Sequence, residues 1–460
     1  MLSPVTNINI SKKYISAIPY YTGNGTFLPH DNVLTEQSQV VSVDYKFVPS
    51  FKAALLQRMQ LFKSVAMNES NPNWQNAVSR QFPLEDVHQD WRTPFDRDKN
   101  RIMNSEGYDR LRYKTQVFPV PENDMVSTRS SHVLQVVDTA RTISKQLGLN
   151  EELAEAIAQG HDIGHAPFGH DGERVLKKIT QANGLPVFWH EKNGLRMVEK
   201  FNLYSDSKGN IRNLNLTYAV RDGIINHCGE VDENGLKPRK EFIDLDGLQK
   251  PAEVQPYTWE GIVVKISDKI AYLGRDIEDA MRIGVISQKN LDELKSIIQS
   301  IKPDFDDEVN NTTLTNLFIN DIIQNSSLVK GIGFSEPVSR IMDAVKDYNT
   351  QNIYYRNDVR TVSKEKCEKV LNTIFNFYSS MYRGSRTIDL LPANDRYINN
   401  FRDWLVAYSD TKYRTPHQKN EIIYHLENPK DYLQAVVDYM SGMTDKFALS
   451  TYNHITGTTV

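Results

Sequence analysis

Long stretches in which apolar residues recur at every third or fourth position are the feature that most limits how this chain can fold. In residues 128–147 the apolar positions of this kind are Val133, Val136, Val137, Ala140, Ile143 and Leu147. Such spacing places these side chains on one face of a helix, and Gly148, directly after the run, is typical of a helix C-terminus. The sequence therefore predicts a helix that is buried along one face.

The same periodicity predicts helices through much of the remaining chain. It is strongest at 258–281, and 151–160 follows Asn150, a residue type that favours the position before a helix. Further helices are predicted at 290–301, 313–323, 337–348, 364–382 and 429 to about 447, with 302–311 as a connection. Strand-like patterns are few, so we expect an all-α fold.

Composition limits the classes of function. The chain of 460 residues has 54 Lys and Arg against 58 Asp and Glu, a net charge of −4, which gives no global basic field for general nucleic-acid binding. Its two cysteines, Cys228 and Cys367, imply no disulfide framework. Because neither a secretory signal nor a membrane-spanning apolar run is visible, we expect a soluble cytoplasmic protein without membrane contact.

The richest chemistry lies in residues 160–174, GHDIGHAPFGHDGER, which hold three of the 11 histidines, three acidic residues and four glycines. His161 and Asp162 offer one imidazole and one carboxylate, a mixed set that suits Mn, Fe, Zn, Ni or, more weakly, Mg. Two further ligands are expected nearby. His132 begins the preceding helix, and Asp268 lies in an apolar helix where an unpaired buried carboxylate would be costly.

Two further patterns place polar groups on single helix faces. His170 and Glu173 are three residues apart, so that the carboxylate can orient the imidazole; an ordinary capping carboxylate is the alternative. One stripe along a helix, with residues at steps of four, is formed by Asp268, Tyr272 and Asp276, and it would line a pocket. The alternative is that Tyr272 is an ordinary core residue and Asp276 an ordinary surface residue. His190, next to Glu191, could support the metal ligands without contacting the metal itself, but a purely structural histidine is favoured.

The order of these residues resembles the HD-superfamily pattern of His, His-Asp and a distant Asp. The segments that carry the resemblance are 92–102, 110–118, 129–132, 161–173, 215–227, 268–276 and 442–445. They look like the deoxyguanosine triphosphate triphosphohydrolases and their broader dNTPase relatives, over residues 92–452. One departure is Asp109, which stands where the family commonly has the first of two arginines before a leucine.

The resemblance implies an organisation and a set of roles. The fold would be an HD-domain helical bundle at 91–290, with an N-terminal extension packed on it at 1–90 and a helical C-terminal region at 291–460 that completes the active site and makes oligomer contacts. The metal ligands by similarity would be His132, His161, Asp162 and Asp268. The catalytic residues would be His170, Glu173 and His165. The substrate contacts would be Gln116, Arg129, Lys269, Tyr272 and Asp276.

The implied reaction is metal-dependent hydrolysis of dNTPs, dGTP among them, to a deoxynucleoside and inorganic triphosphate. The metal would be Mn or Mg, with Fe, Ni and Zn as alternatives, and His170 would act as acid or base. Expected partners are copies of the same chain, as a tetramer or hexamer, and a nucleotide effector or single-stranded DNA. Two other functions stay open: another HD phosphohydrolase, acting on 5′-nucleotides, cyclic nucleotides or alarmones, and a nucleotide sensor or single-stranded-DNA-binding protein without catalysis.

Overall fold

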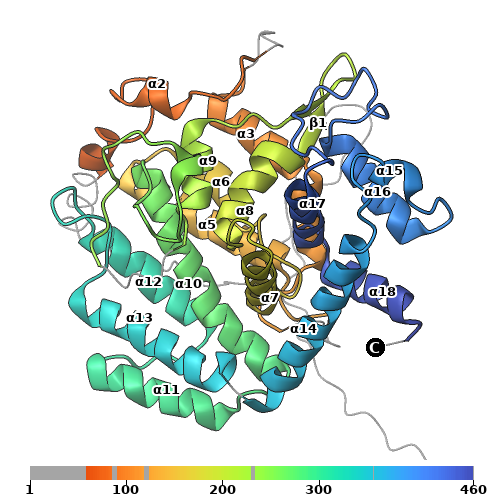
Figure 1. The fold of residues 1–460 in the computed structure, drawn as a ribbon. Helices are drawn as coiled ribbons and strands as arrows, with labels where there is room; N and C mark the ends of the chain where they lie inside the picture. Colours follow the sequence, from red (N-terminus) through yellow and green to blue (C-terminus); the bar gives the residue numbers. More distant parts are fainter. Residues whose placement is uncertain (1–58, 85–90, 119–123, 229–233, 356, 459–460) are drawn as a thin grey trace, which may run out of the picture. The chain divides into compact units, whose positions relative to one another are not determined.

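The computed structural model describes residues 59–84, 91–118, 124–228, 234–355 and 357–458, and the regular secondary structure of these residues is almost entirely helical (Figure 1). The helices are α2 (Trp74–Ala77), α3 (Pro94–Met103), α4 (Glu106–Arg110), α5 (Arg129–Leu147), α6 (Glu151–Gly160), α7 (Gly169–Ala182), α8 (His190–Arg196), α9 (Tyr218–Ile225), α10 (Trp259–Arg282), α11 (Gln288–Ile301), α12 (Asn311–Asn325), α13 (Glu336–Asn349), α14 (Asn357–Ser379), α15 (Thr387–Leu390), α16 (Arg396–Tyr408), α17 (Pro429–Ser441) and α18 (Asp445–Thr456). Short 3₁₀ turns are η1 (Leu111–Tyr113) and η3 (Leu245–Gly247), and π-helical turns are η2 (Met197–Phe201) and η4 (Thr350–Tyr354). In the described residues the strands β1 (Leu203–Ser205) and β2 (Ile211–Asn213) form one antiparallel pair. The predicted all-α fold is confirmed.

Helices α5, α6 and α10 pack together and form the centre of the core, and α3 and α9 lie against α6 (Figure 1). All six apolar residues that predicted the face of α5 are buried. The side chain of Thr128 accepts a hydrogen bond from Ser131 N at the start of α5, and Gly148 ends the helix in the left-handed region with φ 80°. Asn150 caps α6 as expected. The tight α5–α6 turn follows from these two caps.

Two further groups of helices surround this centre. Helices α11, α12 and α13 extend one side, where α12 and α13 contact α10, and α14 packs against α7, α17 and α18 (Figure 1). The prediction of one helix from 429 to about 447 is wrong, because α17 ends at Ser441 and α18 begins at Asp445. Thr444 starts the second helix, where its hydroxyl accepts a hydrogen bond from Phe447 N. A cap of this kind competes with helix continuation.

The predicted N-terminal extension is only partly within the described residues, since 1–58 and 85–90 lie outside them. The described part contacts the core: Phe62 is fully buried and packs edge to face on Trp259 with ring centroids 5.4 Å apart, and Met67 N donates to Glu260 Oε1 at 2.9 Å. The boundaries near 90 and 290 stay a prediction. Across the described segments, no helix combines the length and apolar character needed to cross a lipid bilayer.

Candidate active site

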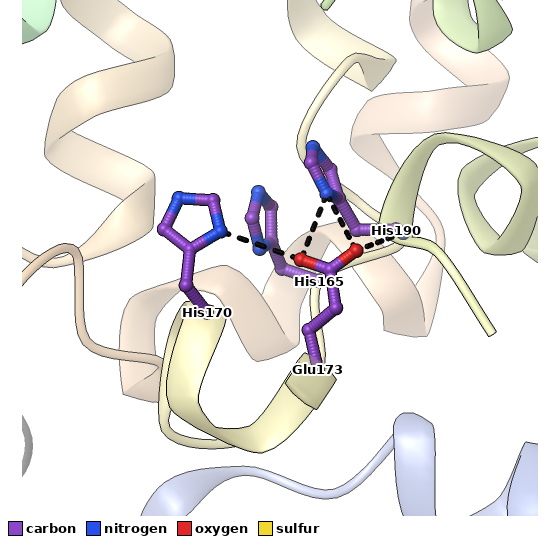
Figure 2. Close-up of side chains that lie close together, drawn as sticks. All are labelled: His165, His170, Glu173 and His190. Atoms are coloured by element: carbon purple, nitrogen blue, oxygen red, sulfur yellow. Dashed lines mark hydrogen bonds and ion pairs between the residues drawn. The ribbon is translucent and has the colours of Figure 1, made fainter. Parts of the chain in front are cut away.

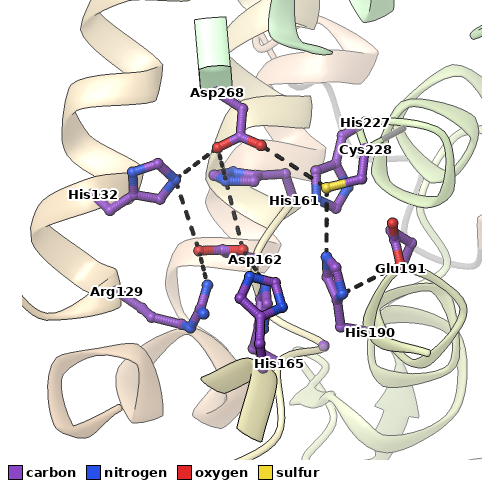
Figure 3. Close-up of polar contacts among 12 residues, drawn as sticks. Arg129, His132, His161, Asp162, His165, His190, Glu191, His227, Cys228 and Asp268 are labelled. Atoms are coloured by element: carbon purple, nitrogen blue, oxygen red, sulfur yellow. Dashed lines mark hydrogen bonds and ion pairs between the residues drawn. The ribbon is translucent and has the colours of Figure 1, made fainter. Parts of the chain in front are cut away.

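Three helical segments bring the four predicted metal ligands together (Figure 3). His132 lies in the first turns of α5, His161 and Asp162 follow the end of α6, and Asp268 lies in the middle of α10. His132 Nε2 is 2.8 Å from Asp268 Oδ1, which is also 3.8 Å from His161 Nε2. Asp162 completes the group, with Oδ1 3.8 Å from His161 Nε2 and Oδ2 4.0 Å from His132 Nε2.

The hydrogen-bonding state of His161 fits a metal ligand. Its Nδ1 donates to the carbonyl oxygen of Ala158 at 2.7 Å, which leaves the lone pair on Nε2. The imidazole is fully buried, and Nε2 has no hydrogen-bond partner among the described residues although it faces two carboxylates. The ligand atoms of His132, His161 and Asp268 all lie within 4.8 Å of one another. Mixed nitrogen and oxygen donors at this spacing suit one divalent cation.

Both carboxylates of this group are held in the ionised form. Burial alone would raise the pKa of Asp268, but the hydrogen bond and charge of His132 outweigh it and lower the pKa to about 2. Burial acts against Asp162 in the same way, and the Arg129 guanidinium, whose Nη1 donates to Asp162 Oδ2 at 2.7 Å, brings that pKa well below its usual value. Arg129 is itself buried and therefore braces a candidate metal ligand. Its predicted role in binding phosphate stays a prediction.

His165 lies beside the metal-ligand group. Its Nε2 is 3.0 Å from Asp162 Oδ1, and its imidazole stacks on that of His190 with ring centroids 3.9 Å apart (Figure 3). Burial, together with the charge of Arg129, holds the pKa of His165 well below its usual value. His165 is therefore a neutral imidazole between the metal-ligand group and the His170–Glu173 pair.

Close packing explains two of the glycines in the 160–174 segment. A Cβ atom on Gly164 would lie 2.1 Å from Gly194 N, and one on Gly172 would lie 1.8 Å from the carbonyl oxygen of Pro167. Neither position can hold a side chain without moving the backbone. The segment with the candidate ligands thus sits directly against α8, where the Asn193 side chain also donates to the carbonyl oxygen of Gly164 at 2.7 Å.

Glu173 joins His170 to a second histidine (Figure 2). His170 Nδ1 is 3.3 Å from Glu173 Oε2, as the spacing on α7 predicted, and the His170 side chain is 66% exposed. The carboxylate also accepts hydrogen bonds from the backbone N of His190 at 2.9 Å and from its Nδ1 at 3.1 Å. Burial alone would raise the pKa of Glu173, but the charge of His190 and the hydrogen bonds from both imidazoles hold it well below its usual value. His170 is thus an exposed imidazole that the ionised Glu173 carboxylate holds in place.

Residues 190–228 contribute more to this site than the sequence patterns indicated. His190 is buried between Glu173 and Glu191, and these carboxylates raise its pKa well above the usual value despite burial. His227 packs edge to face on His161 with ring centroids 5.0 Å apart, and Cys228 follows it (Figure 3). Two features of the sequence could have indicated these contributions. The titratable pair His190 and Glu191 directly follows the apolar run 187–189, and polar residues directly follow the apolar run 223–225.

A strained turn presents His170. Phe168 is not glycine yet has φ 63°, in the left-handed region that costs non-glycine residues free energy. The Asp445 carboxylate at the start of α18 holds this turn, because Oδ1 accepts from Phe168 N at 2.8 Å. Its Oδ2 accepts from Thr115 N at 3.0 Å, next to Gln116. One buried side chain thus fixes two segments of the predicted site.

The predicted substrate residues fall into two groups. Lys269 and Tyr272 line a cavity between α10 and α13 to which none of the four candidate metal ligands contributes. Asp276 is buried, accepts a hydrogen bond from the Tyr354 hydroxyl, and has its pKa raised by burial to about 7. Asp276 Oδ1 and Gln116 Oε1 are both buried oxygens without a hydrogen-bond partner within the described residues.

Comparison with known proteins agrees with this arrangement. The HD domain family matches residues 129–273, which contain all four candidate metal ligands. The deoxyguanosinetriphosphate triphosphohydrolase-like protein of Caldanaerobacter subterraneus subsp. tengcongensis is 33% identical over 377 residues, covering 82% of this chain and 89% of the relative. Proteins of the same name from Clostridium tetani and Geobacter metallireducens are 31% and 30% identical, covering 81% and 83% of this chain and 88% and 93% of each relative.

The helical fold, with a His, a His-Asp pair and a distant Asp meeting at one point, defines an HD-domain protein. Within that class, the chain belongs to the deoxyguanosinetriphosphate triphosphohydrolase-like family. The family resemblance predicted from the sequence is thereby confirmed.

Proposed function

We propose that this chain hydrolyses dNTPs, dGTP among them, to a deoxynucleoside and inorganic triphosphate, with Mn²⁺ or Mg²⁺ as cofactor. HD-family membership supports a metal-dependent phosphohydrolase, and the name shared by the relatives supports dGTP and related dNTPs as the substrate class. The single observation that carries the proposal is the four-ligand group on three helical segments, with the exposed His170 close by: its ring centroid is 5.2 Å from that of His165, which contacts Asp162.

His132, His161, Asp162 and Asp268 would hold the cation. When bound, it would polarise the phosphate oxygens and acidify a nearby water. The Nε2 atom of His170 would either donate a proton to the leaving 5′-oxygen or accept one from the attacking water. Glu173 would fix the orientation of the ring through Nδ1. Proton transfer of this kind contributes about 10²- to 10⁴-fold to turnover. His165, buried and neutral, would lie near the phosphates.

Three residues would contact the sugar, and one of them, Tyr272, would select deoxynucleotides. The Tyr272 ring would pack on the deoxyribose and exclude a 2′-hydroxyl. Gln116 and Asp276, each with an unpartnered buried oxygen, would reach the 3′-hydroxyl, which would donate its hydrogen to one of these oxygens. A buried oxygen without a partner is costly, so binding a hydroxyl there relieves a penalty. Lys269, a point charge on α10, would meet the polyphosphate, and Arg129 would hold Asp162 in place for the cation. Assembly into a tetramer or hexamer, and binding of a nucleotide effector or single-stranded DNA, stay predictions from the family.

The test is to identify the products of each dNTP separately, with Mn²⁺ or Mg²⁺, by ion chromatography. We expect inorganic triphosphate in equimolar amount with the deoxynucleoside, and much less product from the matching ribonucleotide. Asp268→Asn should abolish turnover, whereas Asp307→Asn, at an exposed position before α12, should not. Orthophosphate or pyrophosphate as the only inorganic phosphorus product, with the deoxynucleotide retaining the remaining phosphate, would refute the proposal in favour of another HD phosphohydrolase.

A further inference from the structure

A second group of metal-ligand side chains lies beside the first and shares no residue with it. It consists of His190 at the start of α8, and His227 and Cys228 just after α9 (Figure 3). One ligand atom from each residue lies within 4.8 Å of those of the other two. Cys228 Sγ is 3.5 Å from His190 Nε2. Three donors from two segments far apart in the sequence therefore converge on one point.

His227 is held as a ligand would be. Its Nδ1 donates to the carbonyl oxygen of Ile224 at 2.6 Å, so the ring's lone pair is on Nε2. The residue is 1% exposed, and Nε2 has no hydrogen-bond partner in the part of the chain that the structure describes. A buried acceptor left unpaired is costly, and such groups call for an explanation. A cation bound by Nε2 supplies the missing partner.

His190 is oriented in the same way by carboxylates. Its Nδ1 is 3.1 Å from Glu173 Oε2 and 3.3 Å from Glu191 Oε2, and its Nε2 faces Cys228. A histidine that donates one nitrogen to a carboxylate and presents the other is the usual arrangement at protein metal sites, because the carboxylate fixes the tautomer and raises ligand basicity.

The two groups meet at Asp268. Its Oδ1 lies 2.8 Å from His132 Nε2 in the first group, and its Oδ2 lies 4.0 Å from Cys228 Sγ in the second. We infer that His190, His227 and Cys228 form a second cation site, adjacent to the first and linked to it by Asp268, for a thiophilic divalent ion such as Zn²⁺ or Co²⁺. Thiolate and imidazole donors select borderline-soft ions, whereas the first group offers only nitrogen and oxygen. On binding, the Cys228 thiol and the Nε2 of the His190 imidazolium each release a proton to solvent.

If His190, His227 and Cys228 formed only hydrogen bonds and bound no cation, less of their geometry would be explained. The Cys228 thiol could donate to Asp268 or His190, but this leaves His227 Nε2 buried and unpaired. The inference goes beyond the proposed function, because it concerns which ions bind and where, and its readout does not depend on turnover.

The test is Co²⁺ titration of the chelator-treated full-length protein, followed by absorption spectroscopy. The wild type should bind two equivalents and develop a thiolate-to-cobalt charge-transfer band in the near ultraviolet. Cys228→Ser should lose the band and one equivalent, and His227→Gln should lose one equivalent. Cys367→Ser is the matched control, because Cys367 is buried in α14 and belongs to none of the candidate metal-ligand groups among the described residues, and it should keep both equivalents.

A second measurement does not require a variant to fold. Alkylation of Cys228, which is partly exposed, is followed by mass spectrometry on wild-type protein with and without Zn²⁺, with Cys367 as internal reference. Zn²⁺ should slow alkylation of Cys228 by at least about tenfold, since the free thiolate is the reacting form. A single Co²⁺ equivalent without a thiolate band, or alkylation of Cys228 that Zn²⁺ leaves unchanged, would overturn the second site. Release of triphosphate from dNTPs would still stand in that case.

Discussion

Asp276 should make the free energy of unfolding depend on pH. Its carboxyl is 2% exposed, and burial raises its pKa from 3.8 to about 7, although the Tyr354 hydroxyl partly opposes this. The folded state thus favours the protonated carboxyl. The associated stability is fully present below the unfolded-state pKa and is lost as pH rises through about 7. The shift from 3.8 to about 7 corresponds to about 4 kcal/mol, of which about 3 kcal/mol falls between pH 5 and pH 8.

The perturbation is Asp276→Asn, which keeps the shape and an acceptor for the Tyr354 hydroxyl but cannot ionise. The assay is urea unfolding at pH 5 and pH 8 in chelator-treated protein, because a bound cation would itself favour the ionised carboxylate. Relative to the wild type, the variant should be about 3 kcal/mol more stable at pH 8 than at pH 5. Taking this difference removes the contribution of every other titrating group.

The control is Asp138→Asn, on the exposed face of α5, which removes one charge without involving burial. It should change stability by less than about 0.5 kcal/mol at either pH. If Asp276→Asn follows the same pH dependence as the wild type, the carboxyl ionises at its ordinary pH in the fold, and the reasoning from burial is wrong.

His170→Ala should keep Mn²⁺ affinity, read by isothermal titration, while turnover falls by about 10²- to 10⁴-fold; full turnover would remove His170 from the chemistry. Gly164→Ala should lower the free energy of unfolding by about 1–3 kcal/mol or more, because the new Cβ meets Gly194 N at 2.1 Å; an unchanged denaturation midpoint would contradict this. Asp445→Asn, which turns one acceptor into a donor, should cost about 1–3 kcal/mol and lower kcat with little change in KM; a kcat equal to the wild type would show that the Phe168 turn holds without the carboxylate.

Local patterns predicted most of the fold because the helices begin and end at residues whose capping is local. Thr128, Gly148 and Asn150 each end or begin a helix as expected. The exception is the 429–447 region, where apolar spacing continues across a break made by the Thr444 cap. Periodicity reports which face is buried, and it cannot detect an interruption that preserves that face.

The candidate ligands could be predicted because a buried Asp268 in an apolar helix requires a partner, and the histidines supply it. The contributions of His190 and His227 could not, since they depend on how α8 and the end of α9 pack against the 161–173 segment. Nor does helical spacing reveal that Arg129 pairs with Asp162, because that contact joins two segments across the core.

The most direct measurement of the central claim is anomalous diffraction from crystals grown with Mn²⁺. We predict a peak enclosed by His132, His161, Asp162 and Asp268, with ligand distances of about 2.0–2.3 Å after small side-chain shifts. Full-occupancy manganese found only elsewhere on the chain, with His161 Nε2 still unliganded, would contradict the proposal that these three helical segments fold around a divalent ion.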